Sequence, residues 1–281
     1  MSADKAIFTR DLHFDFQDVE KHDWYSGDPL RTTYCDALSP LFPEGERFFI
    51  KSVKHYIDKI DDPKLKEDVR NFCVQEAFHT REHETYNTHL ATYGYDIETM
   101  EARVKKTLSR VKSPLKKLAV TVAIEHLTAT LSHVILKDPK LLGSSTPIYR
   151  NLWTWHSLEE YEHKGVAFDV YQLVTQHLSP WKRYVLRTSV MFIVTLTIHQ
   201  ILITNFLEML RHRKASLGPK MWAKSAWMLF CMPGYYRRAF LYYLKFYMPF
   251  FHTWKGDDGE LVRQGRERLD AMLNSEIPDA G

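Results

Sequence analysis

Two Glu-x-x-His pairs are the pattern in this chain that most clearly points to chemistry. Glu76-Ala-Phe-His79 and Glu160-Tyr-Glu-His163 each place a carboxylate and an imidazole three residues apart. On an α-helix this spacing puts both side chains on one side of a turn. Carboxylates and imidazoles together suit iron, manganese or zinc. We therefore expect each pair to hold one metal ion, with its glutamate placed to bridge to a second ion.

Helices must present these side chains, and the chain marks where the helices begin. Four pairs in which an Asp, Ser or Thr precedes a proline divide the chain after residue 43: Asp62-Pro63, Ser113-Pro114, Thr146-Pro147 and Ser179-Pro180. Such a pair is typical of a helix start because the polar side chain caps free N–H groups and proline needs no hydrogen bond there. No comparable run alternates apolar and polar residues, so we expect an all-α protein. The expected helices cover roughly 44–60, 64–91, 114–136 and 147–177, with another beginning near 180.

Each of the first four expected helices has one apolar stripe that is interrupted by carboxylates or imidazoles. The first helix contributes Glu46 and the third contributes Glu125. If the first two helices are antiparallel about Asp62, Glu46 and the first Glu-x-x-His pair reach the same height to within about 1 Å, at 1.5 Å per residue. A turn near Leu142 brings Glu125 level with the second pair to roughly 4 Å by the same rise. Four helices can therefore bring four glutamates and two histidines to one level of a bundle.

Some neighbouring residues leave alternatives open. Glu44 competes with Glu46 but falls on a mostly polar face, so we favour Glu46. His156, four residues before the second Glu-x-x-His pair, is either a further ligand or a buried histidine that supports one, and we include it among the ligands. His83 is expected to lie beside the site rather than to bind the metal.

The alternative to a metal is a network of buried ion pairs. Few Lys or Arg residues share these faces, and an unpaired buried charge costs several kcal/mol. A bound cation would remove that cost. Next to the ligands, Glu159 and Glu162 are expected either to be solvated or to orient the ligand imidazoles.

The motifs also resemble known families. The set of Glu46, the two Glu-x-x-His pairs and Glu125 resembles the ligands of ferritin-like di-iron carboxylate proteins, and His156 resembles the extra histidine of di-iron N-oxygenases. Residues 40–178 are similar to a bacterial family named predicted metal-dependent hydrolase, on the segments FPEGERFF, QEAFHTREHE, AIEHLTA and WTWHSLEEYEHKGVAFD. The resemblance implies a ferritin-like four-helix bundle.

These observations lead us to expect a di-iron oxidoreductase, an oxygenase or oxidase that uses O2 and an external electron donor on a lipophilic small molecule. Manganese and zinc are the alternatives to the two irons. A metal-dependent hydrolase with a bimetallic centre is the alternative function, and a non-catalytic metal-binding bundle is the third. We place Glu76 and His79 on one ion. The predicted ligands and catalytic residues are Glu46, Glu76, His79, Glu125, Glu160 and His163, with His156 as a seventh ligand on the ion of Glu160 and His163.

The last third of the chain differs in composition. Residues 188–207 contain no Asp, Glu, Lys or Arg, and aromatic residues crowd the segment that follows. We expect an irregular segment over 1–42, the metal-binding bundle over 43–178, and a hydrophobic, aromatic helical extension over 179–281. The extension packs on the bundle or contacts a membrane surface, and a true membrane span is a further alternative.

Composition narrows the partners and the compartment. The net charge of +3 gives no electrostatic case for nucleic acid. The three cysteines are far apart, which suits a reducing compartment, and the first residues contain no apolar stretch typical of a secretory signal. We expect a cytoplasmic protein, with a peripheral position at the inner face of the membrane and a homodimer as candidate additions.

Overall fold

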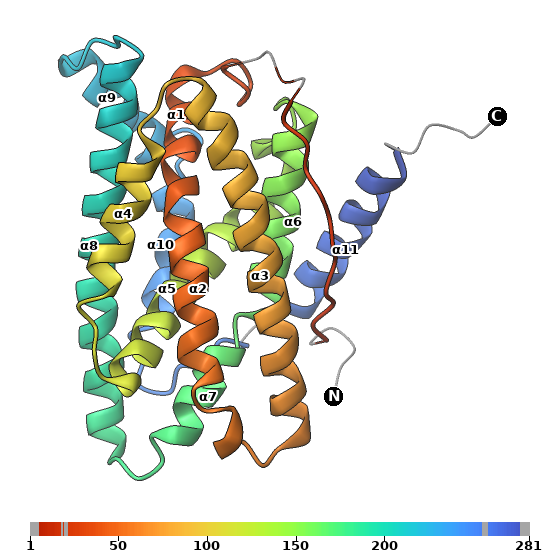
Figure 1. The fold of residues 1–281 in the computed structure, drawn as a ribbon, viewed down its shortest axis with the longest axis vertical. Helices are drawn as coiled ribbons and strands as arrows, with labels where there is room; N and C mark the ends of the chain where they lie inside the picture. Colours follow the sequence, from red (N-terminus) through yellow and green to blue (C-terminus); the bar gives the residue numbers. More distant parts are fainter. Residues whose placement is uncertain (1–5, 18, 20–21, 255–257, 276–281) are drawn as a thin grey trace.

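Helices make up the ordered structure of this chain. The computed structural model describes residues 6–17, 19, 22–254 and 258–275. Within these residues there is no strand, which confirms the all-α prediction. The long elements are α1 (Pro29–Leu38), α2 (Phe42–Lys54), α3 (Pro63–Thr92), α4 (Ile97–Leu108), α5 (Pro114–Lys137), α6 (Pro147–His163), α7 (Val166–Val174), α8 (Pro180–His212), α9 (Pro219–Phe230), α10 (Tyr235–Lys245) and α11 (Asp258–Ser275). They pack side by side as a bundle (Figure 1).

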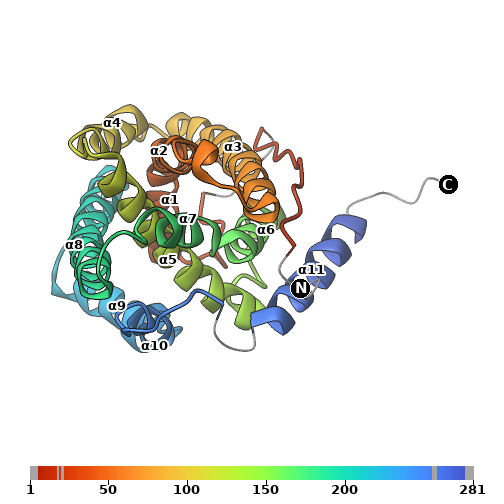
Figure 2. The ribbon, with the colours of Figure 1, turned by 90° about the horizontal axis from the view of Figure 1, so that it is seen from below.

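The centre of the bundle is formed by α2, α3, α5 and α6. Viewed along the bundle, α2 lies against α3, and α5 lies between α6 and α8 (Figure 2). The other helices surround this group: α8 and α10 pack on α5, α4 packs on α2, and α11 packs on α6. The four proline signals used in the sequence analysis mark the starts of α3, α5, α6 and α8, and Asp62 and Ser179 also accept backbone N–H bonds as side-chain caps.

Two helices were missed by the sequence prediction. The N-terminal segment 1–42 was expected to be irregular, yet it contains α1, which Asp28 caps ahead of Pro29. This is the same Asp–Pro signal that marks α3. The second is α4, which Asp96 caps through Thr99.

The helix predicted over 147–177 is broken into α6 and α7 directly after His163. At the break, Lys164 pairs with Asp258 (Nζ–Oδ2 2.9 Å) and lies over the ring of Tyr161. Gly165 is needed here because a Cβ atom would come within 2.7 Å of the Trp254 indole nitrogen. The extension therefore folds back onto the end of α6.

Two apolar clusters fill the bundle, and each takes a different part of the same helices. Along α3, Phe72 belongs to one cluster, whereas Tyr86 belongs to the other. The polar residues of the first Glu-x-x-His pair lie between them in sequence. The candidate site is therefore enclosed by apolar packing on both sides.

Two helices, α5 and α8, are long and apolar enough to cross a membrane. This is weak evidence, because the core helix of a soluble protein passes the same test. Of the most apolar stretch, 61% is buried in α5 and only 33% in α8. In the structure α5 is therefore a core helix, whereas α8 exposes much of its apolar stretch.

Candidate metal centre

All seven predicted ligands are buried, and the four central helices bring them together. The exposed fraction of each side chain is 3% or less. The ligand atoms form two groups, within each of which every atom lies within 4.8 Å of the others. One group is Glu46, His79, His156 and Glu160, and the other is Glu76, Glu125 and His163.

This grouping differs from the one predicted, in which each Glu-x-x-His pair holds its own ion. His79 faces Glu160 on the opposite helix (Nδ1–Oε1 3.7 Å), and His163 faces Glu76 (Nε2–Oε1 3.2 Å). The pairs therefore exchange partners, because α3 and α6 face each other across the bundle. A spacing of three residues fixes the side of the helix but not which neighbouring helix completes the site.

Glu160 lies between the two groups. One carboxylate oxygen is 3.3 Å from His156 Nε2, and the other is 3.5 Å from His163 Nε2. Thr128 donates a hydrogen bond to this second oxygen and fixes its direction. This is the position of a carboxylate that can bridge two ions.

Most of the atoms that could bind a metal have no hydrogen-bond partner among the described residues. Both oxygens of Glu46, Glu76 and Glu125 are buried without one, as is Oε1 of Glu160. The same holds for one nitrogen of each imidazole: His79 Nδ1, His156 Nε2 and His163 Nε2. Such groups are expensive to bury unless they are paired or bind a metal. The residues present therefore fit a pair of cations.

Electrostatics supports the same conclusion. Burial raises the pKa of Glu46 and of Glu76 well above the usual range and raises the pKa of Glu125 to about 7. Burial acts against the charge on His163, but Glu125 and Glu160 raise its pKa to about 10. Glu46 and Glu76 thus hold protons unless cations replace them. Burial also acts against the charge on Glu160, but the neighbouring His163 and His156 lower the pKa of this carboxyl well below its usual range. Cation binding would release protons.

The remaining nitrogen of each imidazole is held by a neighbouring side chain. His79 Nε2 lies 3.1 Å from Glu159, so this buried carboxylate holds the ring, which is one of the two roles expected for it. His163 Nδ1 donates to Gln75 Oε1 (2.9 Å). His156 Nδ1 lies 3.1 Å from His83 Nε2, so His83 lies beside the site as predicted. These contacts fix the ring orientations that a metal needs.

Three supporting residues escaped the sequence analysis: Gln75, Thr128 and Arg10. Gln75 and Thr128 look like ordinary polar residues on their helices, and only the packing of helices reveals their partners. Arg10 comes from the N-terminal segment and contacts Glu159 (3.1 Å) and Glu162 (2.9 Å). No local signal in the sequence links it to the site. Glu162 pairs with Arg10 rather than with a ligand imidazole.

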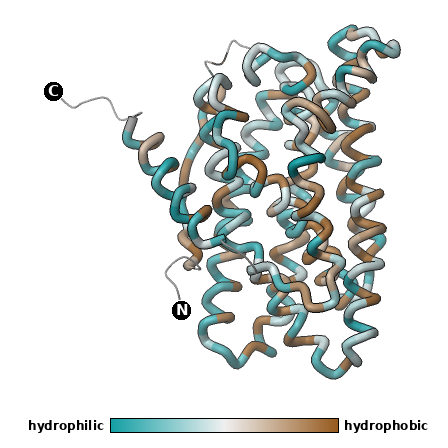
Figure 3. The backbone as a smooth tube through the Cα atoms, turned by 180° about the vertical axis from the view of Figure 1, so that it is seen from behind, coloured by the Kyte–Doolittle hydropathy of each residue, from teal (hydrophilic) through white to brown (hydrophobic). Residues whose placement is uncertain are grey.

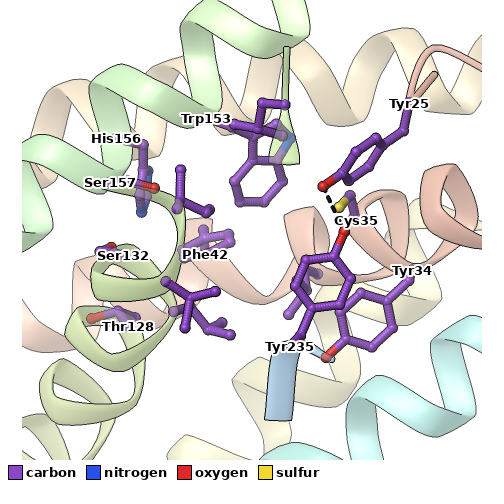
Figure 4. A pocket seen from close by; sticks show the side chains of 15 residues that line it. Tyr25, Tyr34, Cys35, Phe42, Thr128, Ser132, Trp153, His156, Ser157 and Tyr235 are labelled. Atoms are coloured by element: carbon purple, nitrogen blue, oxygen red, sulfur yellow. Dashed lines mark hydrogen bonds between the residues drawn. The ribbon is translucent and has the colours of Figure 1, made fainter. Parts of the chain in front are cut away.

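A narrow cavity of about 60 Å³ reaches the centre beside His156. Its lining is almost entirely apolar, with Phe42 and Trp153 among the walls (Figure 4). Figure 4 shows one end formed by His156, Ser157, Ser132 and Thr128, and the other by Tyr25, Tyr34, Cys35 and Tyr235. The cavity therefore approaches the two groups of ligand atoms from the side of His156.

Fold and site together define a class of protein, an all-helical bundle whose buried carboxylates and imidazoles can hold metal ions. The chain belongs to the family described as predicted metal-dependent hydrolases, whose sequence profile matches residues 8–257. This confirms the resemblance found in the sequence, and the family description makes the protein a metal-dependent enzyme. No curated protein and no solved structure matches the chain.

The prediction of an oxygenase from the sequence was wrong, because the family description names a hydrolase. That reaction was the alternative derived from the same ligands. The error has a physical origin: a set of carboxylates and imidazoles binds redox-active and redox-inert ions alike. The ligands therefore do not distinguish reduction of O2 from activation of water. The expectations of an oxidoreductase activity, of O2 as a substrate and of an electron donor depended on that prediction and are withdrawn.

Proposed function

We propose that this protein is a hydrolase with a bimetallic centre. Glu46, His79, His156 and Glu160 would hold one ion, and the remaining ligands, Glu76, Glu125 and His163, would hold the other. The observation that carries the proposal is the convergence of buried donor atoms that have no hydrogen-bond partner among the described residues. The donor types suit iron, manganese or zinc. We propose a pair of irons, with manganese and zinc as alternatives.

A pair of such ions supplies Lewis acidity, which lowers the pKa of water towards neutrality and polarises an ester or amide carbonyl. The protein contributes orientation and exclusion of solvent. Glu159 and Gln75 hold the rings of His79 and His163 in place, and Thr128 holds one oxygen of Glu160. A fixed geometry of this kind lowers the reorganisation needed during reaction.

Aromatic rings shield the centre from bulk water. Trp155 packs edge-on against His79, and Phe72 packs edge-on against His163, with ring centroids 4.8 Å and 4.9 Å apart. Both aromatic side chains are fully buried. On the side of His156, the narrow cavity leaves space next to the ligands. We propose that 43–178 forms the catalytic unit and that 179–281 covers it.

The test combines metal content with turnover. The protein would be loaded with Fe(II), Mn(II) or Zn(II) under nitrogen and assayed with p-nitrophenyl acetate. We expect two ions per chain and hydrolysis, both lost in a Glu76→Gln/Glu160→Gln double variant. Glu67→Gln, an exposed change on α3, serves as the control and should retain both. Metal binding without turnover for all three ions would leave a non-catalytic bundle, and full metal retention in the double variant would refute the site.

A further inference from the structure

A second, larger cavity lies next to the narrow one. Its volume is about 550 Å³, within the range of pockets that bind small molecules. Residues of α1, α5, α8, α9 and α10 line it, and its apolar lining includes Leu127, Leu131, Ile198, Leu202, Ala239 and Phe240. No residue of the candidate metal centre lines it.

The polar groups of this cavity are largely occupied by one another. Thr195 and Tyr243 share a hydrogen bond (3.1 Å), and Tyr34 donates to Tyr236 (3.2 Å). Thr130 donates to a backbone carbonyl of its own helix. A sugar or nucleotide would find few partners here, because a buried polar ligand needs hydrogen bonds that this lining does not offer. A hydrocarbon needs none.

The two cavities meet at three shared side chains. Tyr34, Leu38 and Leu131 line both of them, and His156 lines the narrow one. These shared side chains form the wall between the two cavities, so a change in their rotamers would join the large apolar cavity to the narrow one beside His156. A long molecule could place its tail in the large cavity and its reactive end beside His156.

We propose that the large cavity holds the hydrocarbon chain of an acyl ester whose carbonyl reaches the metal centre through the narrow cavity. This rests on the proposed hydrolase function. In the reaction, the oxygen of water bonds to the acyl carbon, and the bond from that carbon to the alcohol oxygen breaks. One proton of the water ends on the alcohol, so a carboxylic acid and an alcohol leave the site.

Binding and turnover test this assignment separately. Binding of the fluorescent fatty acid cis-parinaric acid would be titrated with the full chain. Ala239→Trp and Ile198→Phe place rings in the cavity, and we expect affinity to fall by about tenfold or more in each folded variant. Ala226→Trp, an exposed change on α9, is the matched control. Unchanged binding in both cavity variants would overturn the proposal.

Ester chain length supplies the second readout. In metal-loaded protein, Ala239→Trp should lower kcat/KM for p-nitrophenyl octanoate at least tenfold more than for p-nitrophenyl acetate. Equal losses for both esters would overturn the assignment of the tail to this cavity. Fatty-acid binding that is lost in Ala239→Trp but kept in Glu76→Gln, with no ester hydrolysed, would support the cavity and refute the hydrolase.

A different observation, charge, concerns the surface around the mouth of this cavity. Between Asp169 and Asp257 the sequence has twelve Lys and Arg residues and one acidic residue, Glu208. The rest of the chain then holds 26 basic and 34 acidic residues. The positive charge is thus concentrated on the segment that forms α8, α9 and α10.

The same segment exposes large apolar side chains. Ile193 on α8 is 61% exposed, Trp227 on α9 is 60% exposed and Leu241 on α10 is 74% exposed. Hydrophobic residues recur along the length of α8 (Figure 3). Phe230 and Phe240 are both exposed and line the large cavity. The apolar face is therefore continuous with the mouth of that cavity.

We infer that this face docks on a bilayer that contains anionic lipids, such as the inner leaflet of the membrane of a cell. Exposed apolar side chains flanked by basic ones suit the interface of such a membrane. A second copy of the chain would bring like charges together, which disfavours it as the occupant. Docking would also place the cavity mouth against the source of acyl chains.

Vesicle flotation tests the docking. The full chain should float with vesicles of phosphatidylcholine and phosphatidylglycerol, and weakly with phosphatidylcholine alone. Lys220→Glu/Lys224→Glu on α9 should reduce flotation several-fold, and Leu241→Ser should do the same. Lys106→Glu/Lys112→Glu, which makes the same charge change away from the face, should not. Equal flotation of both charge variants, or a dimer in light scattering that Leu241→Ser dissociates, would overturn the inference.

Discussion

The contact between Glu159 and His79 predicts how much a residue outside the ligand set contributes to metal binding. Glu159 is fully buried. One of its oxygens lies 3.1 Å from His79 Nε2, and Arg10 holds the other. Partners that orient a ligand imidazole typically contribute about 10- to 100-fold to metal affinity. This range corresponds to about 1.4–2.8 kcal/mol of binding free energy.

The perturbation is a pair of substitutions. Glu159→Leu removes the acceptor with little change in volume, so we expect a loss near the upper end of that range. Glu159→Gln keeps an acceptor for His79 but removes the charge, so we expect about a tenfold loss. Arg10 retains Glu162 as a partner in both variants.

Competition titration against a chromophoric chelator would measure the affinity of each of the two ligand groups for its metal ion. Only the group that contains His79 should weaken, because Gln75 supports His163 in the other group independently. Glu82→Gln is the matched control: Glu82 is equally buried and binds Arg81, but it contacts no ligand. Equal affinities of Glu159→Leu and the unaltered protein at both groups would refute the reasoning, as would an equal loss in Glu82→Gln.

Three further predictions concern stability. Chelation should lower the midpoint of thermal unfolding by several degrees, because the buried carboxylates lose their cations, and Glu76→Gln/Glu160→Gln should show no such drop. Burial raises the pKa of Asp36 to about 7, so the folded protein holds a proton that the unfolded chain releases above about pH 4. The free energy of unfolding should therefore fall as the pH rises from about 4 to about 7. Urea titrations at several pH values should show this fall, and Asp36→Asn should flatten it. Gly165→Ala should cost about 1–3 kcal/mol in urea unfolding because of the clash with Trp254, whereas Gly45→Ala should cost nothing.

The sequence was informative about features that depend on local spacing. Helix starts follow from side-chain caps and prolines, so the bounds of α3, α5 and the start of α6 were close to those observed. The ligand types also follow from spacing, since charged residues on an apolar stripe need a partner. All seven ligands predicted in this way are buried together.

Features that depend on which helices meet were beyond the sequence. The exchange of partners between the two Glu-x-x-His pairs is set by the packing of α3 against α6. The contact of Arg10 with Glu159 joins residues 149 positions apart, and no local pattern encodes it. The need for glycine at position 165, directly after the break, comes from the distant Trp254. The sequence also did not distinguish an oxygenase from a hydrolase, because the same ligand types serve both reactions.

Two segments far apart in the sequence, the one before α1 and the helix α11, bind the same carboxylate, that of Glu162. Arg10 from the N-terminal segment and Arg266 from α11 each bind Glu162, which in turn lies 3.4 Å from Gln75, the partner of His163. The support of His163 is thus complete only when the segment before α1 and the helix α11 have both packed against α6. Deleting either segment should therefore weaken metal binding at His163, although neither contains a ligand.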